Sequence, residues 1–215
     1  GLPLAVALGE KIKTIGFDLN NNRIKQLKLS NDITLEVSKK EIIRSKYLNF
    51  TSDVNNLKKC NYFIIAVPTP VNKSKKPDLR SLKHASKIVS KLIKKKDIVI
   101  YESTVFPGTT EDICVPILEK FSKLIYNKDF FCGYSPERIN PGDKNHKLSN
   151  TCKITSGSNP RIANIINKLY KKIVKAGTYK ASSIKIAEAA KIIENCQRDI
   201  NISFVNELSL IFHRL

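Results

Sequence analysis

Apolar residues along this chain fall into two patterns, short continuous runs and positions repeated at helical spacing. Short runs rich in β-branched and aromatic residues are typical of buried strands. They occur in the segments TIGFDL, YLNFTS, YFIIAVPTP, DIVIYEST, DFFCGYSPE and CKITSG. Helical spacing predicts helices over residues 2–8, 78–95, 109–124 and 160–173. The alternation predicts an α/β fold, in which a Rossmann-like, doubly wound parallel sheet is covered by helices on both faces.

The last part of the chain, residues 181–215, contains neither glycine nor proline. Its apolar residues recur at helical spacing over the whole length, so we predict one long helix. Ser182 or Ser183 is placed to cap the first turn of this helix. A helix of this length usually crosses between domains or packs against a partner subunit.

The chain carries a formal net charge of +19, from 38 Lys and Arg residues against 19 Asp and Glu residues. The lysines are spread over most of the sequence, so we interpret most of them as solvated surface residues. A basic surface would also attract an anionic small molecule. We predict neither a nucleic-acid nor a membrane partner, because the sequence shows no clustered basic patch and no apolar run of membrane-spanning length.

The 5 cysteines are odd in number, widely spaced and without CxxC pairs. This usage predicts reduced structural thiols, as is typical of cytoplasmic proteins. The first residues show no recognisable secretory signal, so we expect a cytoplasmic location. We assign no residues as metal ligands.

The N-terminal segment has the order of the second half of a βαβ unit, a helix followed by a strand. In dinucleotide-binding folds, a glycine-rich turn precedes this helix, and an acidic residue ends the next strand. Gly1 is placed to be the last glycine of the turn, and Asp18 to be the acid that binds the ribose hydroxyls. Arg23 is placed to lie over the adenosine phosphate or ribose. An unrelated αβ unit would show the same spacing.

Two later strands are predicted to end in threonine-bearing turns. Thr69 belongs to AVPTP, and Thr104 closes YEST. The carboxyl ends of parallel strands border the crevice where ligands bind, so both hydroxyls are candidates for that site. Simple strand-terminating turns are the alternative. Beyond the second strand, Thr109 or Thr110 is predicted to cap the following helix.

Two further groups of polar residues are candidates for chemistry. The segment YSPERINPGD is a loop by composition and carries Glu137, Arg138 and Asp143, although a polar turn would also explain it. On the long helix, Lys191 and Asn195 are four residues apart and share a face. A lysine and an asparagine there would stabilise a developing oxyanion. A solvated helix face is the alternative.

Taken in order, the segments GLPLAVAL, GFD, AVPTP, ESTVFPGTTED, YSPERINPGD and AAKIIENCQRDINISFVNELSLIFHRL closely resemble the nucleotide-sugar 6-dehydrogenases of the UDP-glucose/GDP-mannose dehydrogenase superfamily. The resemblance covers essentially the whole chain. SPERINPGD is more similar to the branch that acts on UDP-N-acetylhexosamines than to UDP-glucose enzymes. The latter typically carry a second Glu where this chain has Pro141.

Members of this family oxidise the C6 alcohol of the sugar to a carboxylate with two NAD in succession, through a thioester on a cysteine that water hydrolyses. The resemblance implies that Thr104 holds the reactive water and that Glu137 is the acid/base of the hydrolysis. Lys191 and Asn195 would stabilise the oxyanions. The residues implied to contact NAD are Gly1, Asp18, Arg23, Thr69 and Thr104.

The resemblance also divides the chain into an NAD-binding domain, residues 1–178, whose first strand is missing, and the start of a central helical dimerisation domain, residues 179–215. It implies a homodimer formed through the long helix. The implied substrate is UDP-N-acetylglucosamine or UDP-N-acetylgalactosamine, oxidised for surface polysaccharide synthesis. The family nucleophile lies in a glycine-rich motif beyond this helix, so we assign no catalytic cysteine and expect the chain alone to lack overall activity.

Two other interpretations stay open. A beta-hydroxyacid dehydrogenase combines the same fold with a helix Lys and Asn, although SPERINPGD argues against it. A basic nucleic-acid-binding or scaffold protein would explain the net charge, although the spread of the lysines argues against it.

Overall fold

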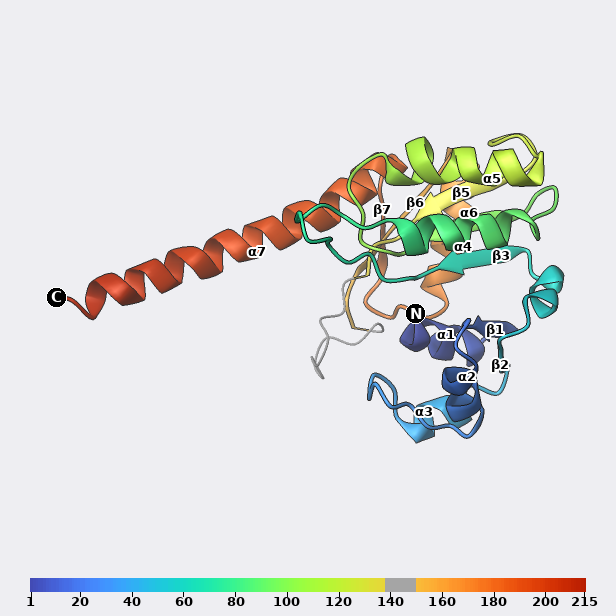
Figure 1. Ribbon diagram of the computed structural model, residues 1–215, viewed down its shortest axis with the longest axis horizontal. Coiled ribbons are helices and arrows are strands. Elements are labelled where there is room, and N and C mark those ends of the chain that lie inside the picture. The colour runs from blue at the N-terminus through green and yellow to red at the C-terminus, as the bar shows by residue number, and fades with distance from the viewer. Residues whose placement is uncertain (138–149) are drawn as a thin grey trace.

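The computed structural model describes residues 1–137 and 150–215 of the chain. Figure 1 shows a body of strands and helices from which one long helix, α7, projects and carries the C-terminus away from the rest. The N-terminus lies at the start of α1, within the body.

The described strands form two sheets. The smaller sheet pairs β1 (Thr14–Phe17) with β2 (Leu48–Thr51). The larger has the order β3 (Tyr62–Ile65), β4 (Ile98–Tyr101), β5 (Phe131–Tyr134), β6 (Lys153–Gly157) and β7 (Thr178–Lys180). Strands β1 to β6 lie inside the predicted apolar runs. β7 is not predicted from the sequence, because its 3 residues are too few to show a period.

The expectation of a parallel sheet is correct for every described pair but one. β6 runs antiparallel to β5, with Tyr134 opposite Ser156, whereas the other pairs are parallel. An apolar run does not encode strand direction, which depends on the preceding connection. A parallel neighbour needs a crossover, usually a helix. The loop-like composition between β5 and β6 therefore favours the antiparallel neighbour that the structure shows.

Helices cover both faces of the larger sheet, as predicted. On β4, Ile98 and Ile100 belong to one core cluster, and Val99 and Tyr101 belong to the other. Because side chains alternate across a strand, a strand that is buried at every position needs cover on both sides. The covering helices are α1 (Leu2–Gly9) and α6 (Pro160–Lys171) on one face, and α4 (Arg80–Ser90) and α5 (Val115–Ser122) on the other.

The structure contains short helices that apolar periodicity did not predict. They are α2 (Asn21–Lys28), α3 (Lys39–Arg44) and the 3-10 helix η1 (Val54–Lys59). Their starts carry recognisable signals. The Asn20 side chain accepts hydrogen bonds from two backbone N–H groups of α2, and Ser38 begins a capping box at α3. Capping chemistry was therefore the better guide in this region.

The predicted helix over residues 109–124 has two parts, and its predicted cap is wrong. A π-helix, η2 (Thr109–Cys114), leads into α5. Neither Thr109 nor Thr110 caps its start, which follows Gly108 in the left-handed region at φ +92°. Glycine adopts this conformation without steric cost. A carboxylate from α7 takes the place of the predicted cap.

The long helix α7 (Ile184–Phe212) begins where predicted, and Ser183 caps it by accepting from the Ile186 N–H at 3.2 Å. Only its first turns are buried against the body. Exposed apolar side chains follow at Ile193, Ile200, Ile202, Phe204, Val205, Leu210, Ile211 and Phe212. No described helix is both long and apolar enough to cross a membrane. The division of the chain at residues 178 and 179 stays a prediction.

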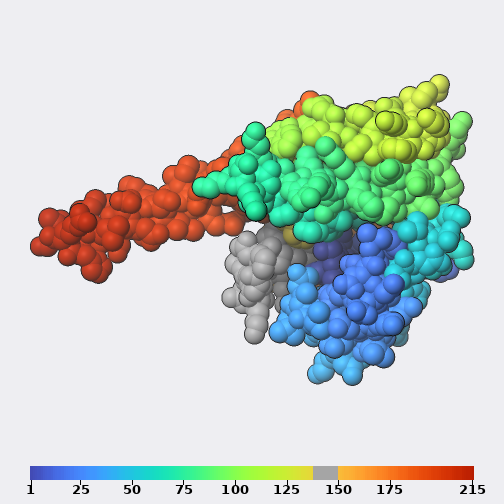
Figure 2. Space-filling model, viewed as in Figure 1, coloured from blue at the N-terminus to red at the C-terminus, as the bar shows by residue number. Residues whose placement is uncertain are grey.

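A large open groove, about 2270 Å³, lies between the two sheets. Side chains of β1 and β3 line it, together with residues of α1, α2, α4 and α6. Figure 2 shows the blue N-terminal part on one side of this hollow and the green segment with α4 on the other.

Candidate active site

Gly1 and Asp18 both line the groove between the sheets. Gly1 is the N-terminal residue flanking α1, and a Cβ added to it would lie 3.3 Å from the Ala66 Cβ, tighter than ordinary packing. Asp18 directly follows β1, is exposed, and accepts a hydrogen bond from the Asn20 N–H at 2.8 Å. A helix N-terminus and an exposed carboxylate at a strand end are thus brought to one groove.

Arg23 lines the same groove, but its guanidinium is held by a neighbouring loop. Its Nη2 lies 2.5 Å from Asp32 Oδ1 and 3.2 Å from Thr34 Oγ1. Burial by itself would raise the pKa of Asp32, but hydrogen bonds from Thr34, Arg23 and the Val37 N–H outweigh it and lower the pKa to about 2. Arg23 Nη1 is buried and has no hydrogen-bond partner among the described residues. Asp32 therefore fixes where this cation lies.

The structure brings Thr69 and Thr104 together. The Thr69 hydroxyl donates to the backbone carbonyl of Thr104 at 2.6 Å, which joins the turns after β3 and β4. One residue earlier, the Ser103 hydroxyl donates to the Val67 carbonyl at 2.6 Å. Thr104 itself is exposed. The two turns are therefore joined by side-chain hydrogen bonds at neighbouring strand ends. The roles of Thr69 and Thr104 in ligand binding stay predictions.

Glu137 follows β5 and is half-buried, directly after the buried Pro136. Arg138, Pro141 and Asp143 of the same loop lie outside the described residues. The charge of Glu137 contributes to the raised pKa of the buried Tyr170, behind desolvation and the nearer Glu102. Glu137 therefore lies close to a buried polar cluster that sequence reasoning did not find.

Lys191 and Asn195 differ in their surroundings although they share a face of α7. Lys191 is 9% exposed, so the interpretation of a solvated helix face is wrong for this lysine. Its Nζ lies 4.0 Å from Glu194 Oε2, and Glu194 also pairs with Arg198 at 3.2 Å. Asn195 is exposed. The buried base of α7 thus carries one of the two predicted groups, and its exposed part carries the other.

Glu188 is a functional candidate that the sequence analysis missed. Its side chain is buried, and its carboxylate accepts from the N–H groups of Gly108 at 2.6 Å and Thr110 at 2.9 Å. Burial raises the pKa of Glu188, although the same N–H donors act in the opposite direction. Its spacing from Lys191 within the buried stripe of α7 was the available signal, because a carboxylate in such a stripe needs partners.

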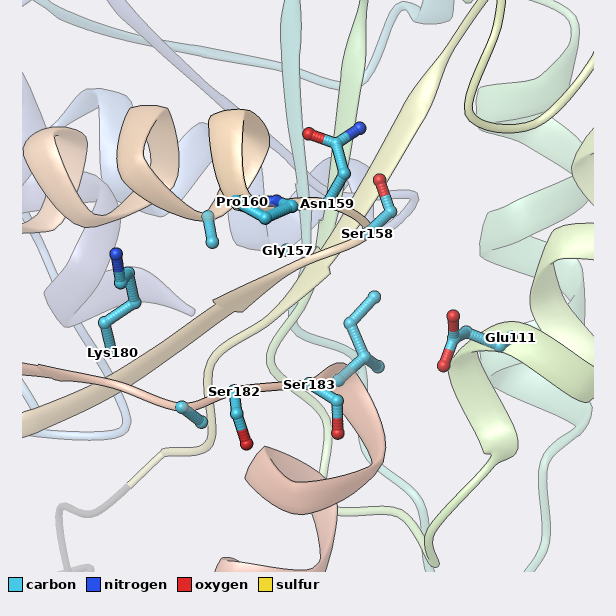
Figure 3. A pocket seen from close by; sticks show the side chains of 11 residues that line it. Glu111, Gly157, Ser158, Asn159, Pro160, Lys180, Ser182 and Ser183 are labelled. Atoms are coloured by element: carbon cyan, nitrogen blue, oxygen red, sulfur yellow. The ribbon is translucent and has the colours of Figure 1, made fainter.

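A smaller cavity, of about 380 Å³, lies between the N-terminal ends of α6 and α7. Figure 3 shows Lys180, Ser183 and Glu111 among the residues around it. None of the site residues predicted from the sequence lines this cavity. Within the described part of the chain, no group of three His, Cys, Asp or Glu side chains is placed to hold a metal ion.

The residues at the groove and at the strand ends suit the NAD that the sequence analysis expects. The start of α1 suits a pyrophosphate, because the N-terminus of a helix favours anions. The Asp18 carboxylate suits the ribose hydroxyls. The tight approach of Gly1 to Ala66 is the kind of packing for which such turns need glycine.

Comparison with protein families gives a match over residues 1–174 to the UDP-glucose/GDP-mannose dehydrogenase family, NAD binding domain. The chain belongs to this family. The expected family and cofactor are thereby confirmed, whereas the contacts of single residues with NAD stay predictions. The family match favours the nucleotide-sugar dehydrogenase resemblance over the beta-hydroxyacid dehydrogenase interpretation. The expectation that the chain has no nucleic-acid partner stays a prediction.

Similar proteins add detail. The chain is 57% identical over 215 residues to UDP-N-acetyl-D-glucosamine 6-dehydrogenase of Pseudomonas aeruginosa, and 55% identical to the protein of that name from Salmonella typhi. Each match covers 100% of this chain and 51% of the relative. The chain therefore spans about half the length of these curated relatives.

Among solved structures, UDP-D-ManNAc dehydrogenase from Pyrococcus horikoshii superposes with a TM-score of 0.91 at 33% identity. This match covers 100% of the chain and 52% of that structure. It supports the Rossmann-like fold as an arrangement that a relative shares.

Proposed function

We propose that this chain is the NAD-binding half of an enzyme that oxidises the C6 alcohol of a UDP-N-acetylhexosamine to the uronate. The observation that carries the proposal is 57% identity along the whole chain to a UDP-N-acetyl-D-glucosamine 6-dehydrogenase. The sequence SPERINPGD points to the same substrate class. The uronate would serve surface polysaccharide synthesis, in the cytoplasm where nucleotide sugars are made.

The chain's own residues divide the work as follows. NAD, when bound, accepts hydride. Thr104 is exposed at the end of β4, so its hydroxyl is accessible to hold a water. Glu137 moves a proton to or from this water during thioester hydrolysis. The ammonium of Lys191, largely withdrawn from solvent, stabilises an oxyanion more strongly than it would in water.

Asn195 lies one turn beyond Lys191 and is exposed in this chain. We propose that its amide assists Lys191 once α7 is covered. The cover is a second copy of the chain, because the exposed stretch of α7 carries many apolar side chains that a second α7 would bury. This makes the working enzyme a homodimer built through α7.

The cysteines of this chain are not proposed as the nucleophile. All five are free. Burial raises the pKa of Cys114 to about 11 and that of Cys132 well above its ordinary value. Since the thiolate is the reactive form, these two side chains are held in the unreactive one. The nucleophile would come from the other half of the enzyme.

The test is a hybrid enzyme in which residues 1–215 replace the matching half of the Pseudomonas aeruginosa relative. Purified hybrid is mixed with NAD and UDP-N-acetylglucosamine, and NADH absorbance is followed. We expect two NADH per sugar oxidised, with UDP-N-acetylgalactosamine as the second substrate tested and UDP-glucose as the discriminating control. A folded hybrid that oxidised only UDP-glucose would overturn the substrate class, and one that oxidised none would overturn the proposal.

The chain alone is the matched control. The proposal assigns the nucleophile and the sugar-binding part to the other half of the enzyme, and residues 1–215 alone would then not hold substrate in a reactive geometry. We expect no sustained NADH formation from it. Steady turnover by the chain alone would show that the division of labour between the two halves is wrong.

A further inference from the structure

A buried charged cluster lies directly behind the candidate active site. Lys153 and Glu102 each have only 2% of the side chain exposed, and Lys153 Nζ lies 2.9 Å from Glu102 Oε1. The Tyr170 hydroxyl donates to the same oxygen at 2.6 Å, and the Lys153 ammonium lies 5.4 Å from the centre of the Tyr170 ring. Burial, followed by the charge of Glu102, raises the pKa of Tyr170 well above its ordinary value, so the phenol stays a donor.

This cluster joins the two loops that carry the proposed catalytic groups. Glu102 directly follows β4 and lies two residues before Thr104. Lys153 also donates to the backbone carbonyl of Pro136 at 3.2 Å, and Pro136 directly precedes Glu137. A single buried ammonium therefore binds the loop of Thr104 through a carboxylate and the loop of Glu137 through a carbonyl.

The antiparallel direction of β6 explains why Lys153 can reach both loops. Because β6 runs against β5, its first residue lies near the carboxyl ends of the parallel strands. Continuing the register of Tyr134 and Ser156 by three residues leads to Glu137 and Lys153. A parallel β6 would place Lys153 at the opposite edge of the sheet, away from the candidate active site.

Stability alone gives a weak reason for such a cluster. A buried ion pair recovers its desolvation cost only when its remaining polar atoms are also satisfied, and apolar replacements are often as stable. Glu102 Oε2 is buried without a hydrogen-bond partner among the described residues. What the ion pair offers instead is a fixed geometry. An ammonium that donates to two acceptors holds both of them at set distances from itself.

We propose that Lys153 is a positioning residue that sets the Glu137 carboxylate relative to Thr104, by anchoring the Pro136 carbonyl to Glu102. The inference rests on the proposed function for the roles of Glu137 and Thr104. Removing the anchor leaves the two catalytic side chains intact and allows the backbone that carries Glu137 to shift. A displacement of about 1 Å in such a group costs on the order of 100-fold in rate.

The first part of the test uses the chain itself. Lys153→Met keeps the length of the side chain and removes its charge, and Glu102→Gln in the same chain avoids a stranded buried carboxylate. Lys94→Met is the control, because its ammonium donates to the Lys58 carbonyl at 3.0 Å on an exposed surface away from both loops. Hydrogen exchange is measured at the amides of Ser135 and Glu137, together with thermal unfolding.

We expect the double variant to unfold near the parent temperature while exchange at these two amides accelerates about tenfold or more, as local opening becomes easier. The Lys94→Met chain should match the parent in both measurements. If the double variant exchanged at the parent rate, the anchor would not hold this loop and the inference would be overturned. Equal acceleration throughout the chain would also overturn it, since that indicates general destabilisation.

The second part measures kcat and KM in the hybrid enzyme. The double variant should lower kcat about 100-fold with KM for NAD unchanged, and it should alter the pH profile of kcat because the carboxylate that moves the proton is displaced. An unchanged kcat and pH profile in an active hybrid would overturn the positioning role. An inactive parent hybrid would instead count against the proposed function, and the exchange result would still decide whether Lys153 holds the loop.

Discussion

Replacing Asp32 with asparagine should remove about 2 kcal/mol from the free energy of unfolding at pH 7. The magnitude follows from the pKa of Asp32, which the folded structure lowers from 3.8 to about 2. Each unit of such a difference corresponds to about 1.4 kcal/mol. Because the folded pKa lies below the unfolded one, this stabilisation is fully present above the unfolded pKa. It is lost as the pH falls through the folded value of about 2.

The assay is urea unfolding of the parent and Asp32→Asn chains at a series of pH values from 7 downward. The difference between the two chains should be constant in the upper range and shrink as the pH falls below about 4. The control is Asp78→Asn. The Arg80 side chain lowers the pKa of Asp78 to about 2 as well. However, the side chain of Arg80 is 90% exposed, whereas that of Arg23, the partner of Asp32, is 14% exposed. Surface pairs of this kind contribute little.

The result that would refute the reasoning is an equal loss of stability in both variants, since burial would then make no difference. A difference between parent and Asp32→Asn that did not change with pH would be equally damaging. It would mean that asparagine disturbs the loop by its shape and that the lost charge plays no part.

Three further predictions concern single side chains. In the hybrid enzyme, Asp18→Ser should improve the use of NADP relative to NAD by about tenfold, because the carboxylate repels a 2′-phosphate. If the ratio of kcat/KM for NADP to kcat/KM for NAD did not change, Asp18 would not select between the two cofactors. Lys191→Ala should lower kcat about 100-fold with little effect on NAD affinity, and a variant that lost NADH binding but kept normal turnover would contradict the assignment. Glu188→Gln should flatten the pH dependence of stability above pH 4.5, because the folded pKa of Glu188 is raised and the parent loses stabilisation as the pH rises through it. Thermal unfolding of both chains between pH 4.5 and 8 checks this, and parallel curves would count against it.

The strands and the long helix were predictable because their signals are local. A run such as that of β4 is apolar at every position, and the whole of α7 lacks glycine and proline. The helix α2 was missed because only Ile24 and Leu27 of its side chains are buried, too few to show a period. The parallel direction expected for β6 was wrong, because strand direction depends on the connection that precedes the strand. The apolar pattern of the strand itself does not contain this information.

The candidate site was predictable where geometry follows from chain order. Thr69 and Thr104 end successive parallel strands, so their meeting needs no further information. Glu188 and Lys153 could not be found in this way, because their partners lie far along the chain and only the folded core brings them together. A buried charge in an apolar stripe indicates that some partner exists, but it does not say which residue that partner is.

The attachment of α7 has a mechanical consequence. Its buried first turns are clasped to the loop after β4 by Glu188, while the rest of the helix stands clear of the body. With 29 residues, α7 is about 43 Å long. It therefore acts as a lever with its fulcrum beside Lys191. The part of α7 beyond Lys191 is about 32 Å long, so a tilt of about 5° at this fulcrum moves its far end by about 3 Å. A small displacement near Lys191 therefore becomes a larger displacement at the C-terminal end of α7. Conversely, a displacement of that end produces a smaller one near Lys191.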